Sequence, residues 1–203
     1  MPKAQRFDVY REFAEDYVAP KAAVFVTLKP AHYLAITGRG EPGDATFQAN
    51  VGALYNVAFT VKMARKFAGR DYTVSKLEGI WSDVGGEKMF LGEPRKVWNW
   101  KLLIRVPPFI TQKETAAAIE KLRAKGKPAE VAQVKLETIA EGQCVQMLHV
   151  GPYTAEGPTL AVMRGFAMAQ GLDFHGPHHE IYLSDPRRVP AERLKTILRY
   201  PVE

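Results

Sequence analysis

Two long segments of the chain have apolar residues at every third or fourth position, and this spacing predicts amphipathic helices. The first covers residues 46–69 (TFQANVGALYNVAFTVKMARKFAG) and the second residues 157–171 (GPTLAVMRGFAMAQG). Asp44 or Thr46 is placed to cap the first helix, and both patterns stop at a glycine, which favours a helix C-terminus. Each helix is expected to cover one face of a sheet with its apolar stripe.

Short apolar runs bounded by turn residues predict the strands of that sheet. They cover residues 22–28, 32–38, 71–82, 97–106, 134–140, 144–151 and 178–184. A third helical pattern lies at residues 111–127, where Thr111 and Glu114 have the spacing of a capping box. The chain therefore alternates runs of strands with single helices.

Similar segments recur in the two halves of the chain, which indicates an internal duplication. The clearest pairs are KLLIRVP (101–107) with KTILRYP (195–201), and GIWSD (79–83) with IYLSD (181–185). In the second alignment Glu78 corresponds to Glu180, 102 positions later. We therefore expect each half to be a strand, helix, strand, strand unit.

The duplication predicts an α+β fold with two antiparallel sheets related by a pseudo-twofold axis. The units are expected at about residues 22–110 and 130–203, joined by the helix at 111–127 and preceded by an N-terminal helical segment at 1–21. Such an axis leaves a cleft between the halves, and clefts of this kind commonly hold ligands.

Composition and charge narrow the class of protein. No apolar run approaches the roughly twenty residues of a membrane-spanning helix, the N-terminal residues are charged, and Cys144 is the only cysteine. We therefore expect a cytoplasmic protein without disulfides or a membrane partner. The net charge is +6, but lysines and arginines are spread along the chain, so we do not expect a nucleic-acid partner. A monomer and a homodimer both remain open.

The segment HGPHHEIYLSDP (175–186) concentrates histidines next to a glutamate. In a strand, His178 and His179 point to opposite faces, so they cannot easily bind one metal ion together. A metal site would need His175 or another loop, and no second cluster of ligands with suitable spacing is present in the sequence. We expect no metal site, and interpret the histidines as residues at the entry of a strand.

Glu180 shares a strand face with His178 and Tyr182. If that face lies in the cleft, aromatic walls would desolvate the carboxylate, raise its pKa and make it a proton donor or acceptor near neutral pH. The carboxylate could instead stay ionised and attract a cationic ligand. The third alternative is a solvated carboxylate on an open sheet face.

Three tryptophans lie on two strands that are expected to be neighbours: Trp81, Trp98 and Trp100. They could form the flat wall of a pocket for an aromatic ligand, or they could belong to the core. Glu78 precedes Gly79, which would permit a bulge or a close approach of another backbone segment.

Seven segments in the same order resemble the GyrI-like small-molecule-binding domain family, and more specifically its stand-alone members. They are YLAITGRGEPG, ALYNVAFTVK, LEGIWS, WNWKLLIRVP, LHVGPYTAE, HHEIYLSDPRR and LKTILRYPV. The resemblance runs from about Ala22 to Val202. The chain departs from it at positions 81 and 82, where Trp-Ser replaces two aromatic residues, which affects the expected pocket shape and not the fold. The resemblance does not extend to the DNA-binding module of regulatory members, so we do not expect direct control of transcription.

The resemblance implies a fold, a site and two classes of function. The effector-binding domains of multidrug-responsive regulators hold cationic aromatic compounds against a buried glutamate, which corresponds to Glu180. The family's ALY helix motif corresponds to Ala53, Leu54 and Tyr55, and its tryptophan-rich strands to Trp81, Trp98 and Trp100. Some stand-alone members are hydrolases that open the cyclopropane ring of DNA-alkylating antibiotics with water and so detoxify them.

We therefore expect a cofactor-independent hydrolase, with a non-catalytic xenobiotic-binding or ligand-sensing protein as the alternative. A protein-interaction role, as in gyrase-inhibiting relatives, is a third possibility. Glu180 would position or deprotonate water, and Tyr55 or Tyr182 would donate a hydrogen bond to the substrate carbonyl. The expected partner is a small aromatic or cationic ligand. The expected binding residues are Glu78, Trp81, Trp98, Trp100, His149, Tyr153 and His178.

Overall fold

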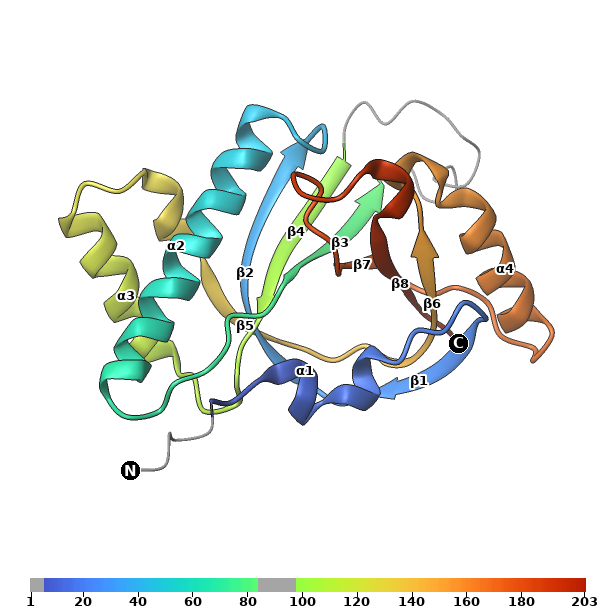
Figure 1. Cartoon of the computed structure of the whole chain (residues 1–203), viewed down its shortest axis with the longest axis horizontal. Helices are drawn as coiled ribbons and strands as arrows, with labels where there is room; N and C mark the ends of the chain where they lie inside the picture. The colour runs from blue at the N-terminus through green and yellow to red at the C-terminus, as the bar shows by residue number, and fades with distance from the viewer. Residues whose placement is uncertain (1–5, 84–97) are drawn as a thin grey trace.

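One antiparallel sheet of eight strands runs through the molecule, in a computed structural model that describes residues 6–83 and 98–203 (Figure 1). The strand order across the sheet is β1-β6-β8-β7-β3-β4-β2-β5. The strands are β1 (Val24–Leu28), β2 (Ala31–Gly40), β3 (Leu77–Asp83), β4 (Trp98–Arg105), β5 (Lys135–Ile139), β6 (Gly142–Val150), β7 (His178–Tyr182) and β8 (Lys195–Pro201).

The described α-helices are α1 (Val9–Glu12), α2 (Ala45–Phe67), α3 (Gln112–Ala124) and α4 (Gly157–Met168). Asp44 caps α2, because its carboxylate accepts a hydrogen bond of 2.7 Å from the Phe47 backbone N–H. The predicted capping box at the start of α3 is confirmed: the Thr111 side chain accepts from the Glu114 backbone, and the Glu114 carboxylate accepts from the Thr111 backbone. The three predicted helices are thus present, with ends shifted by a few residues.

The predicted α+β class is confirmed, and the two units join into one continuous sheet through β3 and β7. One unit contributes the adjacent strands β2, β4 and β3, and the other contributes β6, β8 and β7. Pairing β3 with β7 removes two exposed sheet edges at the junction, which explains why the expected pair of sheets is fused.

Each half of the sheet is completed by a strand that precedes the other unit in sequence. Strand β1 pairs with β6 of the second unit, and β5 pairs with β2 of the first unit. The halves are therefore interlocked, because neither has its full set of strands from one continuous stretch of chain.

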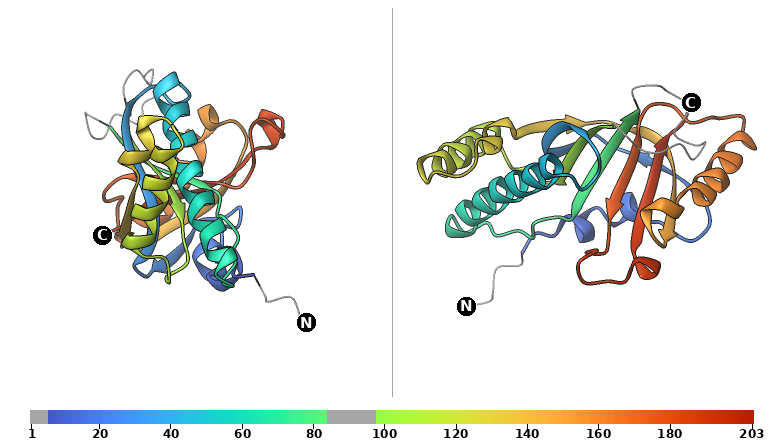
Figure 2. Two further views of the ribbon diagram at one scale, coloured as in Figure 1. Left: turned by 90° about the vertical axis from the view of Figure 1, so that its left-hand side faces the viewer. Right: turned by 90° about the horizontal axis from the view of Figure 1, so that it is seen from above.

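Helices α2 and α4 lie over the two halves of the sheet, with β3 and β7 between them (Figure 2). Beneath α2, residues such as Leu54 and Val57 pack against Ile36 and Leu102 of the sheet. Beneath α4, Met163 packs in a second core with residues of β6 and β8. On the helix-covered face, the central strands β3 and β7 therefore lie between the core under α2 and the core under α4.

The N-terminal segment contacts the opposite face. The backbone carbonyl of Asp16 accepts hydrogen bonds from Gln146 Nε2 (3.4 Å) and from Arg199 Nη2 (2.7 Å). The Asp16 carboxylate also pairs with Arg105 at 2.8 Å. Among the described residues, no helix has the length and apolar character needed to cross a lipid bilayer.

Candidate functional site

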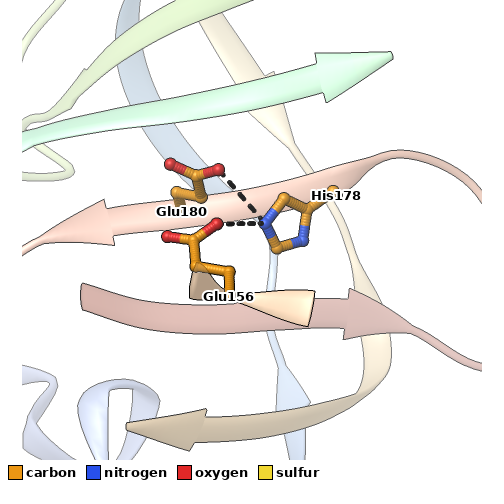
Figure 3. Close-up of side chains that lie close together, drawn as sticks. All are labelled: Glu156, His178 and Glu180. Atoms are coloured by element: carbon orange, nitrogen blue, oxygen red, sulfur yellow. Dashed lines mark ion pairs between the residues drawn. The ribbon is translucent and has the colours of Figure 1, made fainter. Parts of the chain in front are cut away.

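Glu156, His178 and Glu180 converge on the helix-covered face of the central strands (Figure 3). His178 Nε2 lies 3.3 Å from Glu180 Oε1 and 4.0 Å from Glu156 Oε2. All three residues are buried, with exposed fractions of 2% for Glu156 and His178 and 5% for Glu180. Burial of three ionisable groups destabilises the folded protein unless the groups pair with one another or bind a ligand.

Strand alternation and a helix start bring these residues together. His178 and Glu180 lie two positions apart on β7 and therefore share a face with Tyr182. Glu156 is the N-cap residue of α4, but its side chain makes no capping hydrogen bond there. The Glu156 carboxylate lies instead beside His178, as Figure 3 shows.

Tyr182 links Glu180 to the tryptophan of the neighbouring strand. Trp81 Nε1 donates a hydrogen bond of 3.0 Å to the Tyr182 hydroxyl oxygen. Burial, then the charge of Glu180 and a hydrogen bond with it, hold the pKa of Tyr182 well above its ordinary value. Tyr182 therefore stays a neutral hydroxyl and can donate a hydrogen bond at physiological pH.

Gly79 keeps the space in which this contact forms. A Cβ atom at position 79 would lie 2.9 Å from both Trp81 Nε1 and the Tyr182 hydroxyl oxygen. Gly79 is also the cross-strand partner of Glu180, so its missing side chain leaves room beside that carboxylate. The bulge or close backbone approach expected at Gly79 is not what the structure shows: the pairing with β4 and β7 is regular there, and the groups that come close are side chains.

Tyr153 forms a further aromatic wall. Its ring lies edge-on to the Tyr182 ring, with 5.6 Å between centroids. Burial, followed by the charges of Glu180 and Glu156, raises the pKa of Tyr153 to about 12. Tyr153 is half-buried and therefore lies at the border between the carboxylates and solvent.

The three tryptophans have different surroundings. Trp81 contacts Tyr182, and its ring also stacks on Phe47 of α2 at 5.9 Å. Trp98 packs edge-on against Trp81, while Trp100 covers Gly38, where a Cβ atom would come within 2.0 Å of the indole ring. All three belong to the core beneath α2, so Trp81 is the one that joins this core to the site.

The expected equivalence of Glu78 and Glu180 is wrong. In the β3–β7 pair, Glu180 lies opposite Gly79 and Glu78 lies opposite Ile181. Cross-strand partners share a face and successive residues alternate, so the two glutamates point to opposite faces of the sheet. The sequence alignment that pairs Glu78 with Glu180 is shifted by one residue relative to structurally equivalent positions of β3 and β7. Because side chains alternate along a strand, a shift of one residue places a side chain on the other face of the sheet.

Glu78 belongs to a buried polar network on the face that the N-terminal segment covers. His179 lies between two carboxylates, 3.1 Å from Glu78 Oε2 and 2.9 Å from Glu141 Oε1. Arg199 Nη1 donates to the other oxygen of Glu141 at 2.9 Å, and the Tyr17 hydroxyl donates to Glu78 at 3.4 Å. The polar groups of this network are hydrogen-bonded to one another and carry opposite charges, which is typical of a structural role.

The charges of this network set the pKa values of its members. Burial alone would lower the pKa of His179, but the Glu141 and Glu78 carboxylates outweigh it and raise the value to about 9. Burial would likewise raise the pKa of Glu141, yet His179 and Arg199 lower it to about 2. His179 is therefore a cation and Glu141 an anion at neutral pH.

His149 holds the chain that leads into α4. Its Nδ1 lies 2.9 Å from Thr159 Oγ1 and its Nε2 lies 3.3 Å from the Pro152 carbonyl oxygen. Both ring nitrogens are therefore engaged with the connection between β6 and α4. His149 is placed to support the position of Tyr153 and Glu156, which lie in that connection.

Tyr55 lies half-buried on α2, and its ring stacks on Phe59 with 6.1 Å between centroids. Burial raises the pKa of Tyr55, opposed by a hydrogen bond with the Leu77 backbone. Leu77 begins β3, whereas the hydrogen bond with Glu180 is made by Tyr182. The structure therefore brings Tyr182 to the carboxylate, and Tyr55 to the Leu77 backbone.

A pocket of about 1070 Å³ lies at the ends of β2, β3 and β4 and next to residues 173–177. Trp81 and Tyr200 line it. Trp81 also hydrogen-bonds Tyr182, and the Tyr200 ring lies 5.2 Å from the His178 ring. Glu180 itself does not line this pocket.

Sequence reasoning did not single out Glu156, although it stands directly before Gly157 and Pro158 at the expected helix start. Serine, threonine, aspartate and asparagine are preferred at an N-cap, so a glutamate there was a usable signal for another role.

Comparison with known proteins identifies the family and the fold. The family of GyrI-like small molecule binding domains matches residues 23–203. An uncharacterized conserved protein from Listeria innocua is 35% identical, with a TM-score of 0.90, over 98% of this chain and 100% of the other. A hydrolase from Listeria innocua is 34% identical, with a TM-score of 0.89 and the same coverage. The EcmrR C-terminal domain, 11% identical with a TM-score of 0.57, shares the fold over 89% of this chain and 96% of its own. None of the curated proteins matches.

Proposed function

We propose that this chain, which belongs to the GyrI-like small molecule binding domain family, binds a flat, aromatic, electrophilic molecule and adds water to it. The favoured substrate class is a cyclopropane-bearing cytotoxin, so that the reaction detoxifies the compound. The observation that carries the proposal is the contact of buried Glu180 with Tyr182 and His178, which combines a carboxylate with a neutral hydroxyl donor.

The ring-opening step needs a base and a hydrogen-bond donor. Glu180 accepts a proton from water while the water oxygen forms a bond to a cyclopropane carbon. The ring carbon–carbon bond breaks, and its electron pair passes into the conjugated carbonyl group. Tyr182 donates a hydrogen bond to that carbonyl oxygen, which takes up a proton as the product forms. The step as written requires neither a metal nor an organic cofactor.

Aromatic side chains are suited to holding the ring system in place. Trp81 and Tyr153 both contact Tyr182 and flank the carboxylate. Planar ligands stack well on such faces, and a fixed orientation contributes much of the acceleration in reactions that need little covalent help. The hydrolase of Listeria innocua at 34% identity supports a catalytic role over simple binding.

Sequestration or sensing of a cationic aromatic compound is the second candidate function. It is favoured by two buried carboxylates, Glu156 and Glu180, next to the rings of Tyr153 and Tyr182, since this combination attracts cations. In that case the site would bind a ligand without changing it.

Mass spectrometry of a cyclopropane-bearing alkylating compound incubated with the protein tests the proposal. We expect the wild type to convert the compound to its water adduct, Glu180→Gln to bind without conversion, and the exposed control Glu192→Gln to behave as the wild type. Unchanged compound that still binds would favour the second candidate. Conversion at an equal rate by Glu180→Gln would contradict the role of this carboxylate.

A further inference from the structure

We infer that Glu156, His178 and Glu180 form a binding site for a first-row divalent cation, with Zn²⁺ as the representative ion. Each residue offers one ligand atom, and these atoms all lie within 4.8 Å of one another. This goes beyond the proposed function, whose chemical step is complete without a metal.

The distances between the ligand atoms suit such an ion. Two atoms that each lie about 2.1 Å from Zn²⁺ are about 3.4 Å apart in a tetrahedral site. His178 Nε2 and Glu180 Oε1 are separated by 3.3 Å, and His178 Nε2 and Glu156 Oε2 by 4.0 Å. In Figure 3 both carboxylates approach the same ring nitrogen from one side.

The state of His178 is an independent indication. The residue is 2% exposed, yet neither of its ring nitrogens makes a hydrogen bond with the part of the chain that the structure describes. A buried imidazole without hydrogen bonds is destabilising, and coordination of a metal by Nε2 would satisfy that nitrogen.

His179 provides an internal comparison. It too lies between two carboxylates, but its ring nitrogens make hydrogen bonds of 2.9 and 3.1 Å to Glu141 and Glu78. Those carboxylates act as hydrogen-bond acceptors for an imidazolium. The contacts of His178 Nε2 lie in the distance range of an ion pair without hydrogen-bond geometry, which is the arrangement expected of side chains that ligate a common cation.

The donor set indicates the class of metal. One imidazole nitrogen and two carboxylate oxygens suit Zn²⁺, Mn²⁺, Fe²⁺ or Co²⁺, whereas soft ions favour thiolates and Mg²⁺ or Ca²⁺ favour oxygen alone. Three protein ligands leave an open position, as in catalytic zinc sites. The sequence argument against a metal depended on the need for a ligand from a second loop, and Glu156 at the start of α4 supplies it.

Isothermal titration of chelator-treated protein with Zn²⁺, and the absorption spectrum with Co²⁺, test the inference without measuring activity. We expect one ion per chain and a loss of affinity of at least about 100-fold in both His178→Ala and Glu156→Gln. The control is His175→Ala, which removes an exposed histidine of the same segment and is expected to leave binding unchanged. Thermal melting identifies variants that fail to fold, and using two ligand variants keeps the test decisive.

The inference is overturned if the wild type binds no Zn²⁺, or if the binding is lost in His175→Ala and kept in His178→Ala. The assay of water addition is run on the same chelator-treated protein, so the two proposals fail separately. Water addition without metal binding overturns only the metal site. Metal binding without water addition or organic ligand overturns only the proposed function.

Discussion

Glu78 and Glu180 lie on the adjacent strands β3 and β7 but point to opposite faces of the sheet. Glu78 is hydrogen-bonded to His179 and Tyr17, beneath the N-terminal segment. Glu180 lies with His178 and Tyr182 on the face that the helices cover. The central strand pair thus carries a structural polar network on one side and the candidate site on the other.

The structural network predicts a specific dependence of stability on pH. The folded-state pKa of Glu141 is depressed to about 2, so its contribution to the free energy of unfolding is complete above its ordinary value of 4.5. That contribution is lost as the pH falls from 4.5 towards 2. We expect Glu141→Gln to lower the free energy of unfolding by about 3 kcal/mol at pH 7 and by much less near pH 2. Urea denaturation at several pH values measures this, and parallel curves for wild type and variant would contradict it.

Gly79→Ala is expected to disturb the site without adding a polar group. Its Cβ would overlap Trp81 Nε1 and the Tyr182 hydroxyl, so that hydrogen bond would break or shift at a cost of about 1–3 kcal/mol. We expect weaker ligand binding and altered tryptophan fluorescence. The matched control is Gly52→Ala in α2, where a Cβ meets open space and the substitution should be neutral or slightly stabilising. Equal effects at both positions would contradict the packing argument.

Tyr182→Phe and Tyr55→Phe separate the two tyrosines that the sequence left as alternatives. Removal of the Tyr182 hydroxyl takes away the donor next to Glu180, and we expect turnover to fall by about 10²–10³-fold with little loss of folding. Tyr55→Phe should change turnover less than a few-fold, because its hydroxyl lies at the Leu77 backbone. The reverse order of effects, measured as single-turnover rates, would assign the donor role to Tyr55.

Much of the fold could be predicted from periodicity and end signals. Apolar spacing predicted α2, and local sequence identified the cap Thr111 and narrowed the cap of α2 to Asp44 or Thr46, of which the structure shows Asp44. The resemblance to the GyrI-like family is confirmed by the match over residues 23–203.

The site was harder to predict because it depends on register and on contacts between distant segments. The sheet face on which Glu78 lies depends on which residue of β7 is opposite it. A sequence alignment cannot determine this register to within one residue. Glu156 reaches His178 only because α4 packs over the sheet, which brings its N-cap next to β7. Local patterns carry no information on either relationship.

The most direct test of the account is the incubation of a cyclopropane-bearing compound with protein in ¹⁸O-labelled water, for wild type and Glu180→Gln. We predict that the wild-type product gains one labelled oxygen and that the variant, though folded and able to bind the compound, forms no such product. Label incorporation at the same rate in both proteins, or product without label, would contradict the assignment of Glu180 as the group that directs water to the substrate.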